Sequence, residues 1–301
     1  MIHAVETYLT MRRAVGFELS NADYLLRSFA RFAAERGETW VRAATAIEWA
    51  SQAASVAQRD ERLKTVCRFV RYICVEDNQH ELPPSNHFGY RKTRRVPHIY
   101  SGVEIRRLMD TALQLKPADS LKPHTYATLI GLMAATGLRI SEALALQLTD
   151  ATANGLLIRK TKFQKTRLVP LHPSVVAGLD RYLMRRRQIR SNRNEVFIAD
   201  DGSKLRYRDA YRTFQKLLKT ANLLPSRGRR LRLHEMRHTF AVRALEASPA
   251  GRQRIGQHML ALATYMGHVN IYSTYWYLEI TPELLRDIAA AGEAFYCGGQ
   301  P

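Results

Sequence analysis

The residues best suited to chemistry in this chain are a histidine and three tyrosines near its C-terminal end. His268 follows a glycine, and Tyr272, Tyr275 and Tyr277 lie within nine residues of it. A tyrosine hydroxyl is a weak nucleophile in water because its pKa is about 10. It becomes effective where neighbouring cations stabilise the charge that develops during attack. This segment therefore predicts nucleophilic catalysis, provided that other parts of the chain supply the cations.

Two further segments carry cations with the spacing that such a site needs. Arg139 follows closely on Gly137 and begins an otherwise apolar helix, where a half-buried guanidinium needs an anion. Pairing with Glu142, one helical turn away, is the alternative use of this side chain. His234 and Arg237 stand three residues apart, on one face of a predicted helix. Both could therefore reach one phosphate.

Two assignments near these segments are less specific. Lys162 lies in the tip of a predicted hairpin, with Lys160 and Lys165 on either side of it. An ordinary exposed loop lysine is the alternative for Lys162. His238, next to the His-x-x-Arg pair, is expected to point elsewhere and to have a structural role.

The part of the chain that must position these residues is predicted to be mainly helical, with one small antiparallel β-hairpin. Ser101 and Glu104 have the form of a capping box that opens its first helix. Short strands are expected at about 155–159 and 167–171, enclosing a basic tip. Helices are expected at about 101–115, 123–137, 139–146, 173–190, 207–221 and 234–247, with more helices through Tyr277 and a last amphipathic helix from about 281.

The first ninety residues are predicted to form a bundle of about four helices, at about 2–14, 20–36, 46–53 and 57–76. Two consecutive prolines, Pro83 and Pro84, end this helical region. The next residues are expected to be a basic linker that lies against phosphates, with its cations at Arg91, Lys92, Arg94 and Arg95. The predicted domains are thus a helical domain at 1–90, a linker at 91–99 and an α+β domain at 100–301.

The distribution of charge points to a polyanionic partner. The 301 residues carry a net charge of +19. Residues 1–90 hold 11 Arg/Lys and 11 Asp/Glu, so residues 91–301 hold the entire excess, 35 against 16. Such an excess usually marks nucleic-acid binding. A second basic loop contributes Arg227, Arg229 and Arg230.

Membrane, secreted and metal-binding classes are not favoured. No apolar run reaches about 18 residues, and the N-terminus has no signal-peptide pattern, so a cytoplasmic protein is expected. The three cysteines, an odd number without a CxxC motif, argue against a disulfide framework or a zinc site. Cys67 and Cys74 are seven residues apart in an apolar helical segment and are expected in the core.

Together the motifs resemble the tyrosine recombinase (phage integrase) family. The order Arg, Lys, His-x-x-Arg, His, Tyr is complete, and the resemblance covers roughly residues 100–290. Its local matches are TGLRISE at 136–142, LHEMRHTFA at 233–241, RLVPL at 167–171, and Gly-His with a downstream tyrosine. The N-terminal helical domain fits the family's core-binding domain in position and size.

The resemblance implies a role for each matching residue. Arg139 and Arg237 would bind the scissile phosphate and stabilise its transition state. His268 would donate a further hydrogen bond, and His234 would assist proton transfer from the nucleophile Tyr277, which the family's spacing favours over the other two tyrosines. Lys162 would protonate the departing 5′ oxygen. The intermediate would be a 3′-phosphotyrosyl bond, with no cofactor and no metal.

The implied function is site-specific DNA recombination, in integration, excision or movement of a mobile element. The implied partner is a duplex recombination site, bound by a dimer and joined in a synaptic tetramer of this chain or of related recombinase subunits. Two alternatives remain open. One is type IB topoisomerase-like relaxation of DNA, and the other is a DNA-binding regulator without catalysis. The sequence also leaves open whether Tyr277 acts in its own subunit or in a neighbour.

Overall fold

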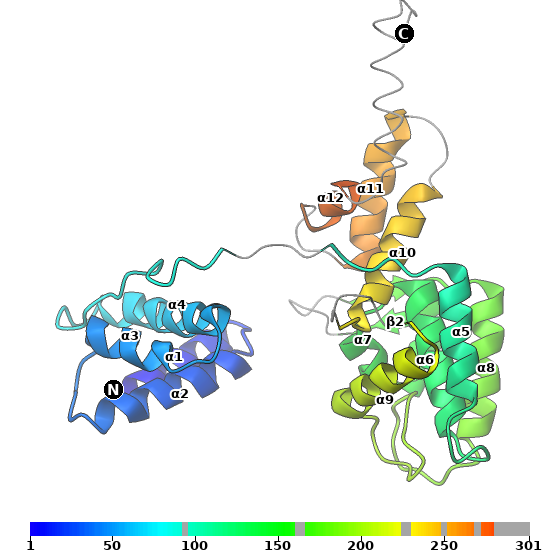
Figure 1. Cartoon of the computed structure of the whole chain (residues 1–301), viewed down its shortest axis with the longest axis horizontal. Helices are drawn as coiled ribbons and strands as arrows, with labels where there is room; N and C mark the ends of the chain where they lie inside the picture. The colour runs from blue at the N-terminus through cyan, green and yellow to red at the C-terminus, as the bar shows by residue number, and fades with distance from the viewer. Residues whose placement is uncertain (92–95, 160–165, 224–229, 248–251, 268–271, 280–301) are drawn as a thin grey trace, which may run out of the picture. The chain divides into compact units, whose positions relative to one another are not determined.

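The computed structural model describes residues 1–91, 96–159, 166–223, 230–247, 252–267 and 272–279 of the chain. The chain divides into two compact units, Met1–Arg95 and Val96–Pro301 (Figure 1). The division falls inside the segment that the sequence marks as a linker. The predicted fold class is confirmed, since the described residues are mainly helical with one small antiparallel sheet.

The first unit consists of helices packed on a common apolar core, including Leu26, Phe29 and Leu63. The longest helix starts where the Ser55 side chain accepts a hydrogen bond from the backbone N–H of Gln58, which caps its first turn. Cys67 is buried and Cys74 is partly buried, and both are free thiols. The helices are α1 (Ile2–Ala14), α2 (Ser20–Ala34), α3 (Ala43–Ser51) and α4 (Val56–Ile73).

The second unit contains the remaining helices and the sheet. The predicted capping box is confirmed at the start of its first helix, where the hydroxyl of Ser101 accepts from the backbone of Glu104 and the Glu104 carboxylate accepts from the backbone of Ser101. The helices are α5 (Gly102–Leu113), α6 (Lys122–Thr136), α7 (Ile140–Ala145), η1 (Leu148–Asp150, a 3₁₀ turn), α8 (Pro173–Arg186), α9 (Tyr207–Thr220), α10 (His234–Glu246), α11 (Arg252–Met266) and α12 (Tyr272–Glu279).

The sheet has three antiparallel strands in the order β1-β2-β3, namely β1 (Ala151–Thr152), β2 (Gly155–Ile158) and β3 (Arg167–Val169). In the predicted hairpin, Leu156 pairs with Val169 and Ile158 pairs with Arg167. Strand β1 was not predicted, because two residues are too few to show alternation. The hairpin tip, with Lys160, Lys162 and Lys165, lies outside the described residues.

The break between α6 and α7 requires a glycine. Gly137 ends α6 with a φ of 61°, in the left-handed region that other residues rarely adopt. A Cβ at this position would also lie 2.5 Å from Cδ1 of Phe240, on helix α10. The absence of a side chain therefore lets the α6–α7 corner approach α10 closely, and it places Arg139 beside that helix.

A smaller apolar cluster holds helices α10, α11 and α12 together. It includes Val242 and Leu245 from α10, Met259 and Met266 from α11, and Tyr277 from α12. The predicted nucleophile is therefore packed against the helix that carries the His-x-x-Arg motif. None of the helices among the described residues is long and apolar enough to cross a membrane.

Candidate active site

The first cation of the site lies at the start of α7. Arg139 is the N-cap residue, and its backbone N–H and its Nη1 both donate to the Glu142 carboxylate, at 3.0 Å and 2.7 Å. Its Nη2 lies 3.4 Å from the carbonyl oxygen of Gly267. The pairing that the sequence offered as an alternative use of Arg139 is thus present. It orients the guanidinium towards the turn just before His268.

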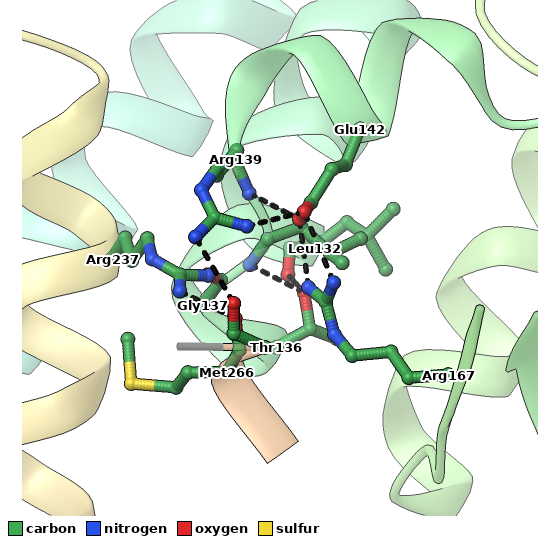
Figure 2. A network of polar contacts seen from close by, with 10 residues as sticks. Leu132, Thr136, Gly137, Arg139, Glu142, Arg167, Arg237 and Met266 are labelled. Atoms are coloured by element: carbon green, nitrogen blue, oxygen red, sulfur yellow. Dashed lines mark hydrogen bonds and ion pairs between the residues drawn. The ribbon is translucent and has the colours of Figure 1, made fainter. Parts of the chain in front are cut away.

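Glu142 is shared with a second arginine, Arg167 of β3, in a two-pronged ion pair (Figure 2). Arg167 Nη1 and Nη2 donate to the two carboxylate oxygens at 3.0 Å and 2.8 Å. Burial alone would raise the pKa of Glu142, but the bonds from Arg167 and Arg139 outweigh it and lower the pKa to about 2. Glu142 is therefore a carboxylate at any physiological pH.

Arg167 also fixes the backbone ahead of His268. Gly267 has a φ of 65°, and a Cβ there would lie 2.9 Å from Arg167 Nη1. The glycine of the Gly-His pair is thus needed both for its backbone conformation and for the space that Arg167 occupies. The base of the β-hairpin, the start of α7 and the end of α11 meet at this arginine.

Glu142→Gln is expected to lower the free energy of unfolding of the chain by about 3 kcal/mol at neutral pH. The ionised form is favoured in the folded state, with a pKa of about 2 against an ordinary 4.5. A lowered pKa gives stability that is complete above about pH 4.5 and is lost as the pH falls towards 2. Denaturant titrations across that range should show the gap between wild type and variant closing.

The matched control for this prediction is Glu246→Gln. Glu246 also pairs with an arginine, Arg243, but that arginine side chain is 56% exposed. Exposed pairs contribute little, so this variant should lie within about 1 kcal/mol of wild type at every pH. A Glu142→Gln gap that stays constant with pH would show that the ionisation of Glu142 does not stabilise the fold.

Arg237 is the most buried cation of the site, with 2% of its surface exposed. It donates through Nη1 to the carbonyl of Gly137 at 2.7 Å and through Nη2 to that of Met266 at 2.6 Å. Within the described residues it has no carboxylate partner. Burial, with a contribution from the nearby charge of Arg139, lowers the pKa of Arg237 to about 10, so it remains protonated at neutral pH.

The hydroxyl of Tyr277 reaches this group of cations from α12. It lies 2.9 Å from Nδ1 of His238, and the tyrosine is 2% exposed. Burial raises the pKa of Tyr277, against the smaller opposing effects of Arg237 and Arg139. In the DNA-free chain burial has the larger effect, so Tyr277 holds its proton.

His234 lies beside His238, Arg237 and Arg139. Its ring meets that of His238 edge-on, with 4.8 Å between ring centroids. Burial, and then the charges of Arg237 and Arg139, lower the pKa of His234, so its imidazole is neutral at pH 7. A neutral imidazole in this position can donate one hydrogen bond without adding a further positive charge to the cluster.

Of the predicted catalytic residues, the structure brings together Arg139, His234, Arg237 and Tyr277. Lys162 and His268 lie outside the described residues. Of the predicted DNA-binding residues, Arg91 and Arg230 are exposed. The others lie outside the described part of the chain, namely Lys92, Arg94, Arg95, Lys160, Lys165, Arg227 and Arg229.

Two residues of the site were not assigned to it from the sequence. His238 was expected to point elsewhere, and this was wrong, because its Nδ1 meets the hydroxyl of Tyr277. The signal was present, since His234 and His238 are four residues apart and so share a helix face. Arg167 lies 25 residues from Glu142 on a different element, and no local pattern pairs the two.

Comparison with known proteins gives a consistent result. The sequence model described as "Phage integrase family" matches residues 101–283, more than half of the chain. A putative integrase/recombinase y4rB of Sinorhizobium fredii is 37% identical over 94% of this chain and 94% of its own length. A second protein of that organism, putative integrase/recombinase y4rE, is 34% identical over 98% of this chain and 96% of its own length.

A solved structure shares the fold. The recombinase XerH, bound to a palindromic difH substrate in a post-cleavage complex, superposes with a TM-score of 0.68 at 19% identity. The match covers 96% of this chain and 84% of XerH.

Proposed function

The chain belongs to the phage integrase family and is a tyrosine recombinase enzyme, and from this premise we propose that it cuts and rejoins DNA at specific sites through a 3′-phosphotyrosyl intermediate. Its physiological task would be integration, excision or movement of a mobile element. The names of its relatives, integrase/recombinase, support this range of tasks.

The observation that carries the proposal is the imbalance of charge in the site. Arg139 and Arg167 both pair with the carboxylate of Glu142, while Arg237 donates to two backbone carbonyls and has no carboxylate partner among the described residues (Figure 2). These four side chains carry a net charge of +2 in a partly buried place, and burying unpaired charge is costly. A phosphodiester would supply the missing anion. A guanidinium group can donate two parallel hydrogen bonds to phosphate oxygens. The positive charges of Arg237 and Arg139 also act on the Tyr277 hydroxyl.

In the proposed reaction, Arg139 and Arg237 bind the non-bridging oxygens, and Tyr277 attacks the phosphorus. The bond between the phosphorus and the 5′ oxygen breaks, and Lys162 gives a proton to that departing oxygen. His268 donates a further hydrogen bond to the phosphate, and the resemblance gives His234 a part in the proton transfer from Tyr277. A 5′-hydroxyl from the partner strand then reverses the reaction. The phosphotyrosine retains the bond energy, so the cycle uses no ATP.

The proposed partner is duplex DNA, consistent with the excess of positive charge after residue 90. The cations of the 91–99 segment would lie along its phosphates, and residues 1–90 would form the second half of a clamp. A dimer of this chain, or of this chain and a related recombinase, would occupy each site, and two such dimers would form the synapse. The proposed place of action is the cytoplasm.

The test is covalent trapping on DNA that cannot be religated. The full chain is incubated with a library of nicked duplexes of randomised sequence, and the DNA that resists denaturant is isolated and sequenced. We expect a covalent adduct on the 3′ phosphate, a free 5′-hydroxyl and one enriched sequence. Absence of an adduct with every member of the library would contradict the proposal and leave the DNA-binding regulator.

The topoisomerase-like alternative is distinguished from recombination with the same trapped DNA sequence. Placed on two different duplexes, it should yield exchanged products under the recombinase proposal. Relaxation of supercoiled DNA without any exchanged product would instead identify type IB topoisomerase-like activity. Since both reactions share their chemistry, only the identity of the rejoined strands distinguishes them.

A further inference from the structure

We infer that His238 is the residue that takes the phenolic proton from Tyr277 during strand cleavage and returns it during ligation. This inference rests on the proposed function, since it concerns the cleavage step of that reaction. It assigns a catalytic role to a histidine outside the His-x-x-Arg pair. This differs from the role that the resemblance implies for His234, which is left with the phosphate and not with the nucleophile.

The first support is the position of the imidazole on the reacting atom. His238 Nδ1 and the Tyr277 hydroxyl oxygen are 2.9 Å apart, within the distance that direct proton transfer needs. The contact joins α10 to α12 across 39 residues, so it is a product of the tertiary fold. Trp276 also packs edge-on against His238, with ring centroids 5.3 Å apart, which restricts the orientation of the imidazole.

The second support is the different environment of His234. Within the described residues, His234 meets the ring of His238 and makes no hydrogen bond to Tyr277. The positive charges that act on it are those of Arg237, Arg139 and Arg232. Arg237 and Arg139 are the proposed phosphate ligands, so His234 lies near the phosphate. The same two charges act on Tyr277, and it is the hydrogen bond to Tyr277 that distinguishes His238 from His234. His238 lies between His234 and the nucleophile.

The third support is that Tyr277 keeps its proton until it attacks. Burial raises the pKa of this hydroxyl, and the opposing effects of Arg237 and Arg139 do not outweigh it. A phenol in this state needs an acceptor at the moment of attack. Of the residues that α11 packs against α10, Tyr265 contacts Phe240 and His258 contacts the Ala244 carbonyl, both further along the helix.

With the proton of His238 on Nε2, its Nδ1 accepts the Tyr277 proton as the oxygen–phosphorus bond forms. The bond between the phosphorus and the 5′ oxygen breaks, and that oxygen receives a proton from the general acid, proposed to be Lys162. His238 is then an imidazolium. When a 5′-hydroxyl attacks the phosphotyrosine, the proton of that hydroxyl returns to Lys162 and His238 returns its own proton to Tyr277. No oxidant, reductant or metal is needed.

The experiment compares His238→Asn with wild type in single-turnover cleavage at saturating DNA, on the nicked duplex selected by trapping. Asparagine places an amide oxygen near the position of Nδ1, so it can accept the hydrogen bond but cannot take up the proton. We expect cleavage to fall about 10²-fold to 10³-fold. The decline of the wild-type rate at low pH, where a histidine base becomes protonated, should disappear from the profile.

Two matched arms isolate the proton acceptor from the other steps. His234→Asn should slow cleavage but keep the low-pH decline, since His238 is still present. A substrate with a 5′-bridging sulfur has a leaving group that needs no protonation. This substrate should restore the cleavage rate of a Lys162→Ala variant but not that of His238→Asn. In His238→Ala, which tests the same site without the amide, added imidazole should recover part of the rate.

Several results would overturn the inference. One is a His238→Asn rate within about threefold of wild type with the low-pH decline intact, which would make His238 a positioning residue. Another is loss of the decline in His234→Asn alone, which would make His234 the base. Both results require that wild type still forms the adduct. A wild type without any adduct would instead overturn the proposed function itself.

Discussion

Tyr277→Phe is expected to form no covalent adduct with DNA, while its affinity for the same DNA stays within about threefold of wild type. The phenylalanine removes only the attacking oxygen. The packing of the ring among Val242, Leu245 and Met266 is retained. DNA affinity depends on many phosphate contacts, and this side chain adds no charge to them. The measurements are denaturing electrophoresis for the adduct and a binding titration in the absence of denaturant.

The control is Tyr275→Phe, on the same helix α12. Tyr275 is 47% exposed, whereas Tyr277 is 2% exposed and meets His238. The control variant should cleave at the wild-type rate. An adduct that persists in Tyr277→Phe and vanishes in Tyr275→Phe would transfer the role of nucleophile to the exposed tyrosine. The structure would then represent a state in which the nucleophile lies outside the site.

The outcome matters because three tyrosines lie close together in the sequence, and only the family's usual spacing favours Tyr277 among them. Burial and a direct histidine contact favour Tyr277 on grounds independent of that spacing. The same burial keeps the hydroxyl protonated, so the DNA-free chain does not carry a preformed phenolate. Since His238 already contacts the hydroxyl, attack is then expected only when a phosphate is in place.

The parts of the site that were predictable from the sequence are those encoded within a single element. Gly137 ends α6 because its backbone adopts a left-handed conformation, and Arg139 begins the next helix. His234 and Arg237 share a face of α10 through helical periodicity. The two strands of the hairpin also follow from two short apolar runs on either side of a basic tip.

The parts that escaped prediction depend on contacts between elements. Arg167 reaches Glu142 across 25 residues, and Arg139 reaches the Gly267 carbonyl across 128 residues. No periodicity records such pairs, because each side chain obeys its own local pattern whether or not the other is near. The effect of burial on the pKa of Tyr277 is likewise invisible locally. It depends on the apolar cluster that α10, α11 and α12 build together.

Arg237→Met is expected to slow single-turnover cleavage by about 10²-fold to 10³-fold, without lowering the free energy of unfolding of the DNA-free chain. The wild-type guanidinium is buried beside Arg139 with no carboxylate of its own among the described residues. The pKa of Arg237 is about 10 against an ordinary 12.5. A lowered pKa in a base means that the folded state disfavours its charged form, at a cost of about 3 kcal/mol below pH 10.

Methionine removes that charge and fills similar space, although the carbonyls of Gly137 and Met266 lose their donors. Since replacing a buried charge by an apolar side chain is often neutral or stabilising, we expect unfolding free energies within about 1 kcal/mol of wild type, or higher. Arg243→Met, on the exposed side of α10, is the matched control, and it should change neither stability nor cleavage.

A DNA-free titration tests the same argument from the side of the ligand. If the site lacks an anion, inorganic phosphate should raise the melting temperature of wild type and of Arg243→Met, but raise that of Arg237→Met much less. Equal stabilisation of all three proteins would mean that phosphate binds elsewhere on this basic chain. A loss of several kcal/mol in Arg237→Met would mean that Arg237 serves the fold. With neither result, the unpaired charge is a cost to the fold that is relieved when the scissile phosphate binds.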